Sequence, residues 1–348
     1  MTDEDIVPEA PAPRVWPGLL PWQRVAALAA LAGRARWPHA LLLAGPAGTG
    51  KRTLALEFAR ALLCEAPSAE GLACGQCPGC RYVVAGQHPD LRIVEPVDID
   101  DDGTATPVPW ITVGHVRGLI EWAHLTSHRH MAKVAVIAPA ELMNAAAANA
   151  LLKTLEEPPS GTFVILVAHQ PGRLPATVRS RCRWMAAPVP DEPAGLAWLA
   201  EQGVDNAASL LAQAGGAPLA ARALAEPGYQ AERTVWLDAL ASPRTLAPVE
   251  MGARIDAAPR ETRKDRLAAA IDWLLDWCGD LGAVQAGGAV RRNGDYAAAL
   301  TALGKAVAPV RLFRYHRSLL RQRAQIAHPL QPRLVAEALL FDYLELFR

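Results

Sequence analysis

A glycine-rich loop early in the chain has the residue types and spacing of a phosphate-binding loop. Gly45, Gly48 and Gly50 lie close together and are followed by Lys51. Glycines let backbone N–H groups turn around phosphate oxygens, and the lysine ammonium can reach the β- and γ-phosphates of a nucleotide. The pattern should end in Ser or Thr, whose hydroxyl holds Mg²⁺, but this chain has Arg52 there. The sequence therefore predicts a nucleotide-binding loop without its metal ligand, and leaves open whether ATP is still bound.

The acidic residues of a working NTPase site are also missing from their expected place. In such enzymes carboxylates at the end of a buried strand hold Mg²⁺. The matching strand is residues 133–137, and it runs into Ala-Pro-Ala before Glu141. Thr53 follows the loop one position too late, about 100° around the helix, and is expected to point elsewhere. We therefore expect no Mg²⁺ site and no ATP hydrolysis by this chain alone.

A cluster of cysteines follows the helix that the loop should start. The spacing is C-x9-C-x2-C-x2-C, and the residues are Cys64, Cys74, Cys77 and Cys80. The two short steps bring thiolates together around one ion, and four thiolates match a structural Zn²⁺ site. An iron–sulfur cluster is the alternative, because C-x2-C-x2-C also occurs in ferredoxins. We expect zinc in an insert spanning residues 64–80, with no open position for catalysis.

Composition sets the general class of the molecule. The chain has 348 residues, 51% of them hydrophobic, so two or three domains with sizeable cores are expected. The formal net charge is zero, which argues against binding nucleic acid by bulk electrostatics. No apolar run approaches the roughly 20 residues of a membrane helix, and the acidic start differs from a secretory signal. We expect a cytoplasmic protein without membrane contact, whose reduced cysteines favour metal over disulfides.

The first half of the chain alternates between strand and helix patterns. The predicted strands are residues 39–44, 133–137, 162–167 and 184–187. The predicted helices are residues 23–34, 53–63, 113–125, 145–155 and 174–179. Residues 98–109 are acidic and contain proline, and are expected to form an exposed loop. The alternation predicts an α/β fold with a parallel, doubly wound sheet.

Strand patterns fade after residue 190. Residues 194–224 read as a small helical domain, and residues 231–348 read as a separate helical bundle. A linker is expected at residues 226–228 and a loop at residues 247–252, where proline and glycine interrupt the pattern.

Two arginine-rich segments carry charge that could meet a partner. The first contains Ser180, Arg181 and Cys182. Such a turn is usually solvated surface, but a rigidly held arginine can also reach the γ-phosphate bound by a neighbouring subunit. The second places Arg311, Arg314, Arg317 and Arg321 along one helical face, with Arg323 nearby. A solvated face, a contact with another subunit and a contact with DNA phosphate all remain open for it.

Three segments together resemble the clamp-loader branch of the AAA+ family. They are Leu-Leu-Lys-Thr-Leu-Glu-Glu-Pro-Pro at residues 151–159, Leu174-Pro175, and Ser-Arg-Cys at residues 180–182. The four-cysteine insert is similar to that of the bacterial members, and the resemblance covers residues 20–225 well. It implies four parts: a lead-in at residues 1–20, an AAA+ P-loop domain at 21–189, a helical lid at 190–228 and an all-α collar at 229–348.

The resemblance also implies roles for individual residues. Arg181 would be an arginine finger acting in trans, the four cysteines would be zinc ligands, and Lys51 would be the lysine of a degenerate loop. Leu219 stands where ATPase relatives carry a sensor arginine, and His169 is the one candidate at the first sensor position. The expected partners are the gamma/tau and delta subunits of a clamp loader within a DNA polymerase holoenzyme. Through that complex the chain would meet a sliding clamp and primer-template DNA.

Other functions are open from the sequence. An active clamp-loader ATPase of the gamma/tau type would need the Mg²⁺ hydroxyl, the acidic pair and a longer chain. A DNA-repair or recombination ATPase would hydrolyse ATP as an isolated chain, stimulated by DNA. A pure interaction module that uses ATP as structural glue is the third alternative.

Overall fold

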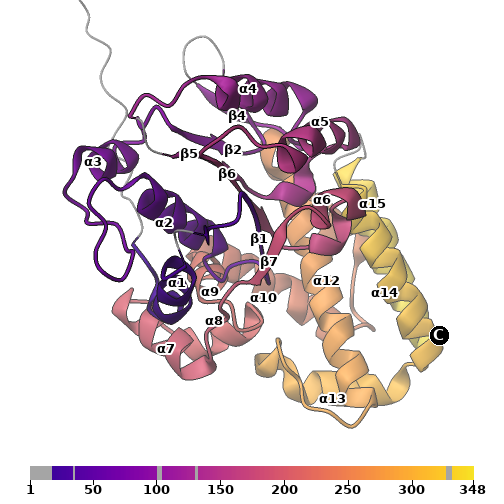
Figure 1. Cartoon of the computed structure of the whole chain (residues 1–348). Helices are drawn as coiled ribbons and strands as arrows, with labels where there is room; N and C mark the ends of the chain where they lie inside the picture. The colour runs from indigo at the N-terminus through magenta and orange to yellow at the C-terminus, as the bar shows by residue number, and fades with distance from the viewer. Residues whose placement is uncertain (1–17, 34–35, 100–103, 130–131, 327–330) are drawn as a thin grey trace, which may run out of the picture. The chain divides into compact units, whose positions relative to one another are not determined.

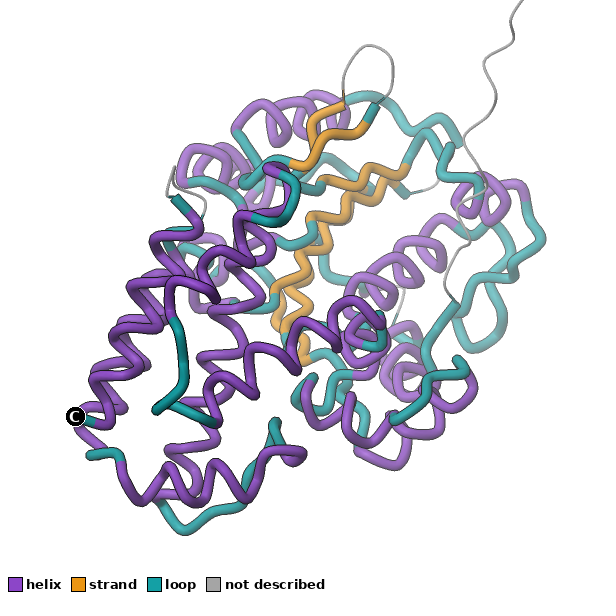
Figure 2. The backbone as a smooth tube through the Cα atoms, turned by 180° about the vertical axis from the view of Figure 1, so that it is seen from behind, coloured by secondary structure: helices purple, strands orange, loops and turns teal. Residues whose placement is uncertain are grey.

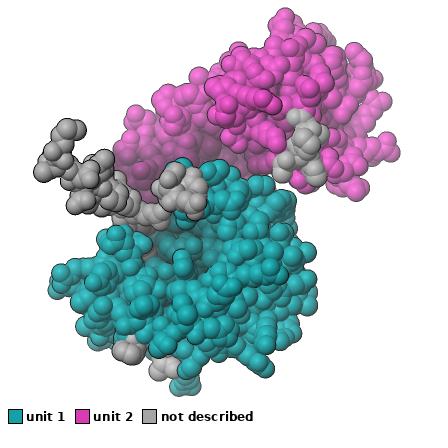
Figure 3. Space-filling view, turned by 90° about the horizontal axis from the view of Figure 1, so that it is seen from above, with its two compact units in different colours: residues 1–189 teal, residues 190–348 magenta. Residues whose placement is uncertain are grey.

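The computed structural model describes residues 18–33, 36–99, 104–129, 132–326 and 331–348. The chain forms two compact units, Met1–Val189 and Pro190–Arg348, which are coloured separately in Figure 3. Most of the predicted lead-in, residues 1–17, lies outside the described residues, as does the predicted helix end at residue 34.

A five-stranded sheet forms the centre of the first unit (Figure 2). Its strands are, in chain order, β1 (Ala40–Ala44), β2 (Leu91–Val94), β5 (Lys133–Ile137), β6 (Thr162–Ala168) and β7 (Arg183–Ala186). Their order across the sheet is β2-β5-β6-β1-β7, and every pair is parallel. Leu42 of β1 lies opposite Leu166 of β6 and Trp184 of β7. The parallel sheet predicted from the alternating pattern is therefore confirmed.

Helices cover both faces of this sheet (Figure 1). They are, with the short 3-10 turns, η1 (Pro21–Gln23), α1 (Arg24–Leu31), α2 (Lys51–Leu63), α3 (Pro78–Val84), α4 (Val113–His124), η3 (Ala140–Leu142), α5 (Ala145–Glu156), η4 (Pro171–Arg173) and α6 (Ala176–Arg179). α1 and α2 share one buried cluster with Leu41 and Leu43 of β1. α4 and α5 share another with Leu42, on the opposite face. Successive side chains of β1 point to opposite faces of the sheet and therefore pack against the helices on each face.

Two predictions for the first unit were wrong, and one strand was missed. α2 begins at Lys51, two residues before the predicted start, because the loop runs directly into the helix. Residues 98–109 are not simply a loop, since β3 (Val97–Ile99) and β4 (Ala105–Pro107) pair as an antiparallel hairpin. β2 was not predicted at all. All three strands have only three or four residues, and β3 and β4 are largely exposed, so their residues carry little periodic signal.

The second unit is entirely helical in its described residues. Its helices and turns are α7 (Glu192–Glu201), α8 (Ala207–Gln213), α9 (Pro218–Leu224), α10 (Pro227–Ala241), α11 (Pro248–Asp256), η5 (Arg260–Thr262), α12 (Arg263–Gln285), η6 (Gly294–Tyr296), α13 (Ala297–Ala306), α14 (Pro309–Ala324), α15 (Pro332–Leu344) and η7 (Glu345–Phe347). Among the helices described, none combines the length and apolar character that crossing a membrane demands.

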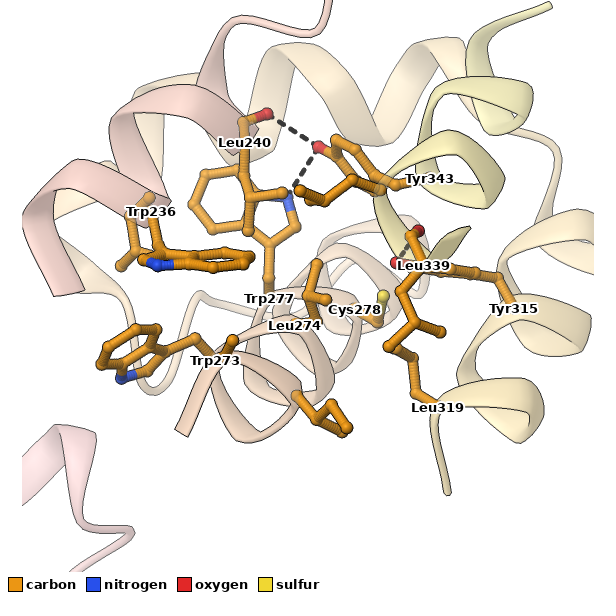
Figure 4. Packing of buried hydrophobic residues seen from close by; sticks show 14 of the residues in the cluster. Trp236, Leu240, Trp273, Leu274, Trp277, Cys278, Tyr315, Leu319, Leu339 and Tyr343 are labelled. Atoms are coloured by element: carbon orange, nitrogen blue, oxygen red, sulfur yellow. Dashed lines mark hydrogen bonds between the residues drawn. The ribbon is translucent and has the colours of Figure 1, made fainter. Parts of the chain in front are cut away.

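Aromatic residues of α10, α12, α14 and α15 build the core of this unit (Figure 4). Trp277 Nε1 donates to the Tyr343 hydroxyl at 3.0 Å, and that hydroxyl donates to Leu240 O at 2.7 Å. Tyr315 donates in the same way to Leu339 O at 2.8 Å. These three buried side chains thus each have a hydrogen-bond partner, which a tightly packed core requires. The predicted fold class, a parallel α/β unit followed by helices, is confirmed.

Two predicted breaks in the second unit fall on helices. α10 begins at Pro227, inside the expected linker, and α11 begins at Pro248, inside the expected loop. Proline is tolerated in the first turn of a helix, because the N–H it lacks would have no partner there. The division into a lid and a collar at residue 228 stays a prediction.

Candidate functional site

The P-loop connects β1 to α2 and needs its glycines for steric reasons. Gly48 and Gly50 have φ angles of 74° and 86°, which L side chains rarely adopt. A Cβ at Gly50 would clash with the Leu20 side chain and lie 2.7 Å from Gln23 Nε2. Gly50 is also the N-cap residue of α2, so the loop delivers Lys51 to the first position of that helix.

The loop is hydrogen-bonded to η1, a contact that no sequence pattern predicts. Trp22 Nε1 donates to Thr49 O at 3.0 Å, and Gln23 Nε2 donates to Gly50 O at 2.8 Å. Gln23 is buried, with 1% of its surface exposed. The loop therefore keeps its shape through protein contacts of its own.

The lysine of the loop points into the protein. Lys51 is only 2% exposed, and its ammonium donates a short hydrogen bond to Pro46 O within the same loop. Burial lowers the pKa of Lys51 to about 8, although the Glu141 carboxylate acts in the opposite direction. Glu141 thus lies close enough to act on the Lys51 charge.

Neither residue after the lysine supplies a hydroxyl to the Mg²⁺ position. Arg52 is turned outward, and its guanidinium binds both carboxylate oxygens of Glu95, at 2.5 and 3.1 Å. Thr53 is buried in α2, with 7% of its surface exposed. An arginine and a core threonine therefore replace the metal ligand.

The end of β5 carries no carboxylate, and the next acidic residue along the chain, Glu141, is hydrogen-bonded to the backbone after β6. Ala138 is joined to Pro139 by a cis peptide bond, and Glu141 follows in η3. Glu141 Oε1 accepts hydrogen bonds from the backbone N–H groups of His169 and Gln170, at 2.8 and 2.9 Å. Burial, together with the Lys51 ammonium, lowers the pKa of His169, although the Glu141 carboxylate acts in the opposite direction.

The four cysteines of the insert come together as one donor set. Their sulfurs all lie within 4.8 Å of one another. Cys64 Sγ lies 3.8 Å from Cys77 Sγ, and Cys74 Sγ lies 4.0 Å from Cys80 Sγ. A tetrahedral ion with metal–sulfur bonds of about 2.3 Å places its ligands about 3.8 Å apart. This cluster can therefore bind a metal ion, and its residues fit the geometry of zinc.

Backbone N–H groups surround the same sulfurs. The N–H of Cys77 donates to Cys74 Sγ at 3.3 Å, and the N–H of Cys80 donates to Cys77 Sγ at 3.4 Å. Hydrogen bonds from Gln76 and Cys77 lower the pKa of Cys74 to about 6, whereas burial raises the pKa of Cys80 to about 12. A buried thiol that resists ionisation needs a cation beside it before it can act as a thiolate.

The Ser-Arg-Cys motif lies immediately after α6, and a carboxylate from α5 holds its arginine. Arg181 Nε donates to Glu156 Oε1 at 2.5 Å, and Nη1 donates to Thr177 O at 2.9 Å. The Arg181 side chain keeps 33% of its surface exposed. Ser180 Oγ donates to Thr177 O, and Cys182 Sγ contacts Val178 O, so the flanking residues fix the turn itself.

The arginine stripe of the second unit lies on α14. Arg311, Arg314, Arg317 and Arg321 are all exposed. On the same helix, Val310 and Phe313 are each 63% exposed and Leu320 is 49% exposed. Arg323 is different, because it pairs with Asp272 of α12 at 2.7 Å.

Comparison with known proteins places this chain in a family. A protein named DNA polymerase III subunit delta' from Pseudomonas aeruginosa is 39% identical over 265 residues, which cover 74% of this chain and 76% of the relative. The chain belongs to the DNA polymerase III delta' family. The family model described as DNA polymerase III, delta subunit, matches residues 23–190. The predicted family resemblance is therefore confirmed.

Other proteins resemble the chain over shorter stretches or at lower identity. DNA polymerase III subunit delta' of Escherichia coli is 38% identical over 206 residues, covering 58% of each chain. A subunit named tau from Bacillus subtilis is 34% identical over 149 residues, covering 42% of this chain and 24% of the relative. A solved structure, the gamma subunit-related protein of Thermotoga maritima, is 16% identical with a TM-score of 0.43, covering 92% of this chain and all of that one.

Proposed function

We propose that this chain is a non-hydrolysing subunit of the DNA polymerase III clamp loader and supplies an arginine finger to a neighbouring ATPase subunit. The observation that carries the proposal is Arg181, which Glu156 and Thr177 O hold while a third of its side chain stays exposed. A guanidinium fixed in this way can enter a neighbour's ATP site. There it stabilises the charge that develops on the transferring phosphoryl group.

The chain's own loop supports the non-hydrolysing part of the proposal. Arg52 is paired with Glu95 where a Mg²⁺ ligand is needed, and alanine and proline follow β5 where carboxylates are needed. Catalysis of phosphoryl transfer depends on such metal ligands, because the metal neutralises charge on the phosphates. An active ATPase of the gamma/tau type, or a repair ATPase, would need them as well.

We propose gamma/tau and delta subunits as direct partners in the cytoplasm, with the sliding clamp and primer-template DNA reached through the complex. The relatives named delta' and tau support membership of this assembly. The α14 surface formed by Val310, Phe313, Leu320 and the four exposed arginines is suited to a partner that offers apolar and acidic side chains.

We also propose that Cys64, Cys74, Cys77 and Cys80 bind a structural Zn²⁺ ion. Four sulfurs within 4.8 Å of one another leave room for a single ion rather than for several irons and sulfides. When bound, the ion would hold four thiolates in one tetrahedron. The cysteines would thereby fasten the insert to the end of α2, where Cys64 is the C-cap residue.

The arginine finger is tested by ATP turnover in a loader reconstituted from this chain, its partner subunits, clamp and primed DNA. Arg181→Ala should lower turnover at the ATP site it faces by about 10³-fold or more, while the complex still assembles. Arg179→Ala is the matched control, because Arg179 is an exposed arginine only two residues away and should leave turnover unchanged. Equal turnover of wild type and Arg181→Ala would leave the chain with a scaffold role only.

A further inference from the structure

A groove with a volume of about 640 Å³ lies between α1 and the edge strand β7. α1 lines one side of it with small residues, at the spacings of three and four that belong to one helical face: Ala26, Ala29, Ala30 and Gly33. Trp37 and Leu41, which are buried, line its inner part. Arg183, Trp184 and Met185 of β7 line the other side. Apart from its arginines, the groove is therefore lined mainly by apolar side chains.

β7 has a neighbouring strand on one side only. It pairs with β1, and no strand lies beyond it in the described sheet. The N–H of Ala187, just after β7, donates to Ala44 O at 2.8 Å. Because backbone groups alternate in direction along a strand, those of Trp184 and Ala186 point away from β1. They form an unpaired edge, which an extended segment can join as a further strand.

Two arginines give the groove a positive charge. Arg36 and Arg183 both line it, and both are exposed. Neither guanidinium forms an ion pair with another described residue, whereas Arg52 and Arg181 are both paired. No acidic residue is found among the described residues that line the groove. A segment that carries both carboxylates and apolar side chains would match its charge and its lining.

The start of the chain has this composition. Residues 3–5 are Asp-Glu-Asp, residues 6 and 7 are Ile and Val, and residues 1–9 contain no lysine or arginine. β7 begins with Arg183 and continues with Met185 on the same face of the sheet, where Met185 packs against the cluster that α1 joins. A strand parallel to β7 would therefore set its acids beside the arginine and its apolar residues beside the methionine.

The start of the chain can also reach this edge. Residues 1–17 precede the described part of the chain, where Leu20 lies against Gly50 of the P-loop. The chain thus enters at the carboxyl end of β1, which is also the carboxyl end of the parallel strand β7. A segment parallel to β7 would end at this same place. Residues 8–17 can then span up to about 33 Å, much more than the roughly 4.8 Å between neighbouring strands.

We propose that the groove and the free edge of β7 bind residues 3–7 of this chain as an added strand. The backbone groups of Trp184 and Ala186 pair with the segment, and its carboxylates lie near Arg36 and Arg183. Because the segment is tethered, its effective concentration at the groove is on the order of millimolar, so that weak contacts are enough. The docked segment covers an edge that another chain could otherwise join. Docking involves neither the arginine finger nor the cysteine cluster.

The test is hydrogen exchange of the full-length chain, read by mass spectrometry on a peptide that covers residues 183–187. A docked segment protects the two amides that face away from β1, which a free edge leaves open to water. Their exchange should become about tenfold faster or more when the three acids are reversed together, as Asp3→Lys, Glu4→Lys and Asp5→Lys. Equal exchange in wild type and in this variant overturns the proposal.

A charge exchange separates docking from a general change in charge. Arg36→Glu together with Arg183→Glu should also speed exchange of these amides, and adding the three lysine substitutions should restore their protection. Unchanged slow exchange at the buried strand β5 shows that each variant is folded. Arg92→Glu is the control, because Arg92 is an exposed arginine on β2, the opposite edge strand, and should leave exchange at β7 unchanged. A combined variant that regains no protection would equally overturn the proposal.

Discussion

Arg181 owes its position to Glu156, a residue 25 positions earlier in the chain. Glu156 is the last residue of α5, and Arg181 follows α6, so two helix ends place the ion pair. An arginine side chain has many rotamers, and fixing it before a partner arrives lowers the entropy lost on binding. The two sequence motifs of the family resemblance thus meet in one contact.

Removing this carboxylate should weaken the finger without unfolding the protein. Glu156→Gln frees Arg181 to sample other rotamers, and ordering one such side chain costs about 0.5–1.5 kcal/mol. We therefore expect turnover at the facing ATP site to fall by about 3- to 10-fold, much less than for Arg181→Ala. The thermal midpoint should hardly move, because exposed ion pairs contribute about 0–1 kcal/mol.

The measurement is the same reconstituted ATPase assay, with Glu157→Gln as the neighbouring control. A Glu156→Gln loader as active as wild type would mean that Arg181 is positioned by its partner instead. A loss as large as that of Arg181→Ala would mean that Glu156 itself has a direct role.

At the residue scale, the sequence predicted what local patterns carry and missed what distant contacts create. The loop glycines, Arg52 and the cysteine set are recognisable because spacing along the chain defines them. Trp22 contacts Thr49 across 27 positions, and Glu141 contacts His169 across 28. No local pattern encodes such pairs, so only the folded chain reveals them.

The zinc insert is the element whose stability depends most directly on a ligand. Cys64 and Cys80 are fully buried, at 0% exposure, and without a cation they would be neutral thiols that do not hold the insert together. Removing the metal with a chelator should therefore lower the thermal midpoint of the chain. A loss of about 2 kcal/mol would correspond to about 4–8 °C for units of this size.

The chelation experiment is read by calorimetry, with metal content measured before and after. Cys77→Ser provides the control, since a chain whose site is already broken should show little further shift with chelator. An unchanged melting curve after complete removal of zinc would contradict a structural role for the ion.

At the element scale, helices and buried strands were predictable, whereas elements defined by tertiary packing were not. The bounds of β5 agree with the prediction residue for residue, because its five positions are all buried and apolar except the lysine. α11 was mistaken for a loop because it contains Pro248 and Gly252. Gly252 lies against α15, since a Cβ there would meet the Glu337 side chain. That neighbour lies 85 residues further along, beyond any local pattern.

The whole molecule carries no net charge, which limits how it can act on DNA by itself. Its function is therefore expected to depend on surfaces that meet other subunits. The α14 surface has the features of such a contact, because three large apolar side chains are exposed among four arginines. Arg317 also stacks over the Phe313 ring, 5.9 Å from its centroid, which orders both side chains.

We expect Phe313→Asp to weaken assembly while leaving the chain folded. Phe313 is 63% exposed, so its loss removes little from the core, but a carboxylate there would face whatever apolar surface the partner provides. If Phe313 is a central contact, the affinity for the partner subunits should fall by about 30-fold, equivalent to about 2 kcal/mol.

The affinity is measured by sedimentation of the mixed subunits. Val249→Asp is the control, since Val249 is 50% exposed on a different helix, α11. An unchanged affinity for Phe313→Asp would mean that α14 is a solvated face and that assembly uses another surface.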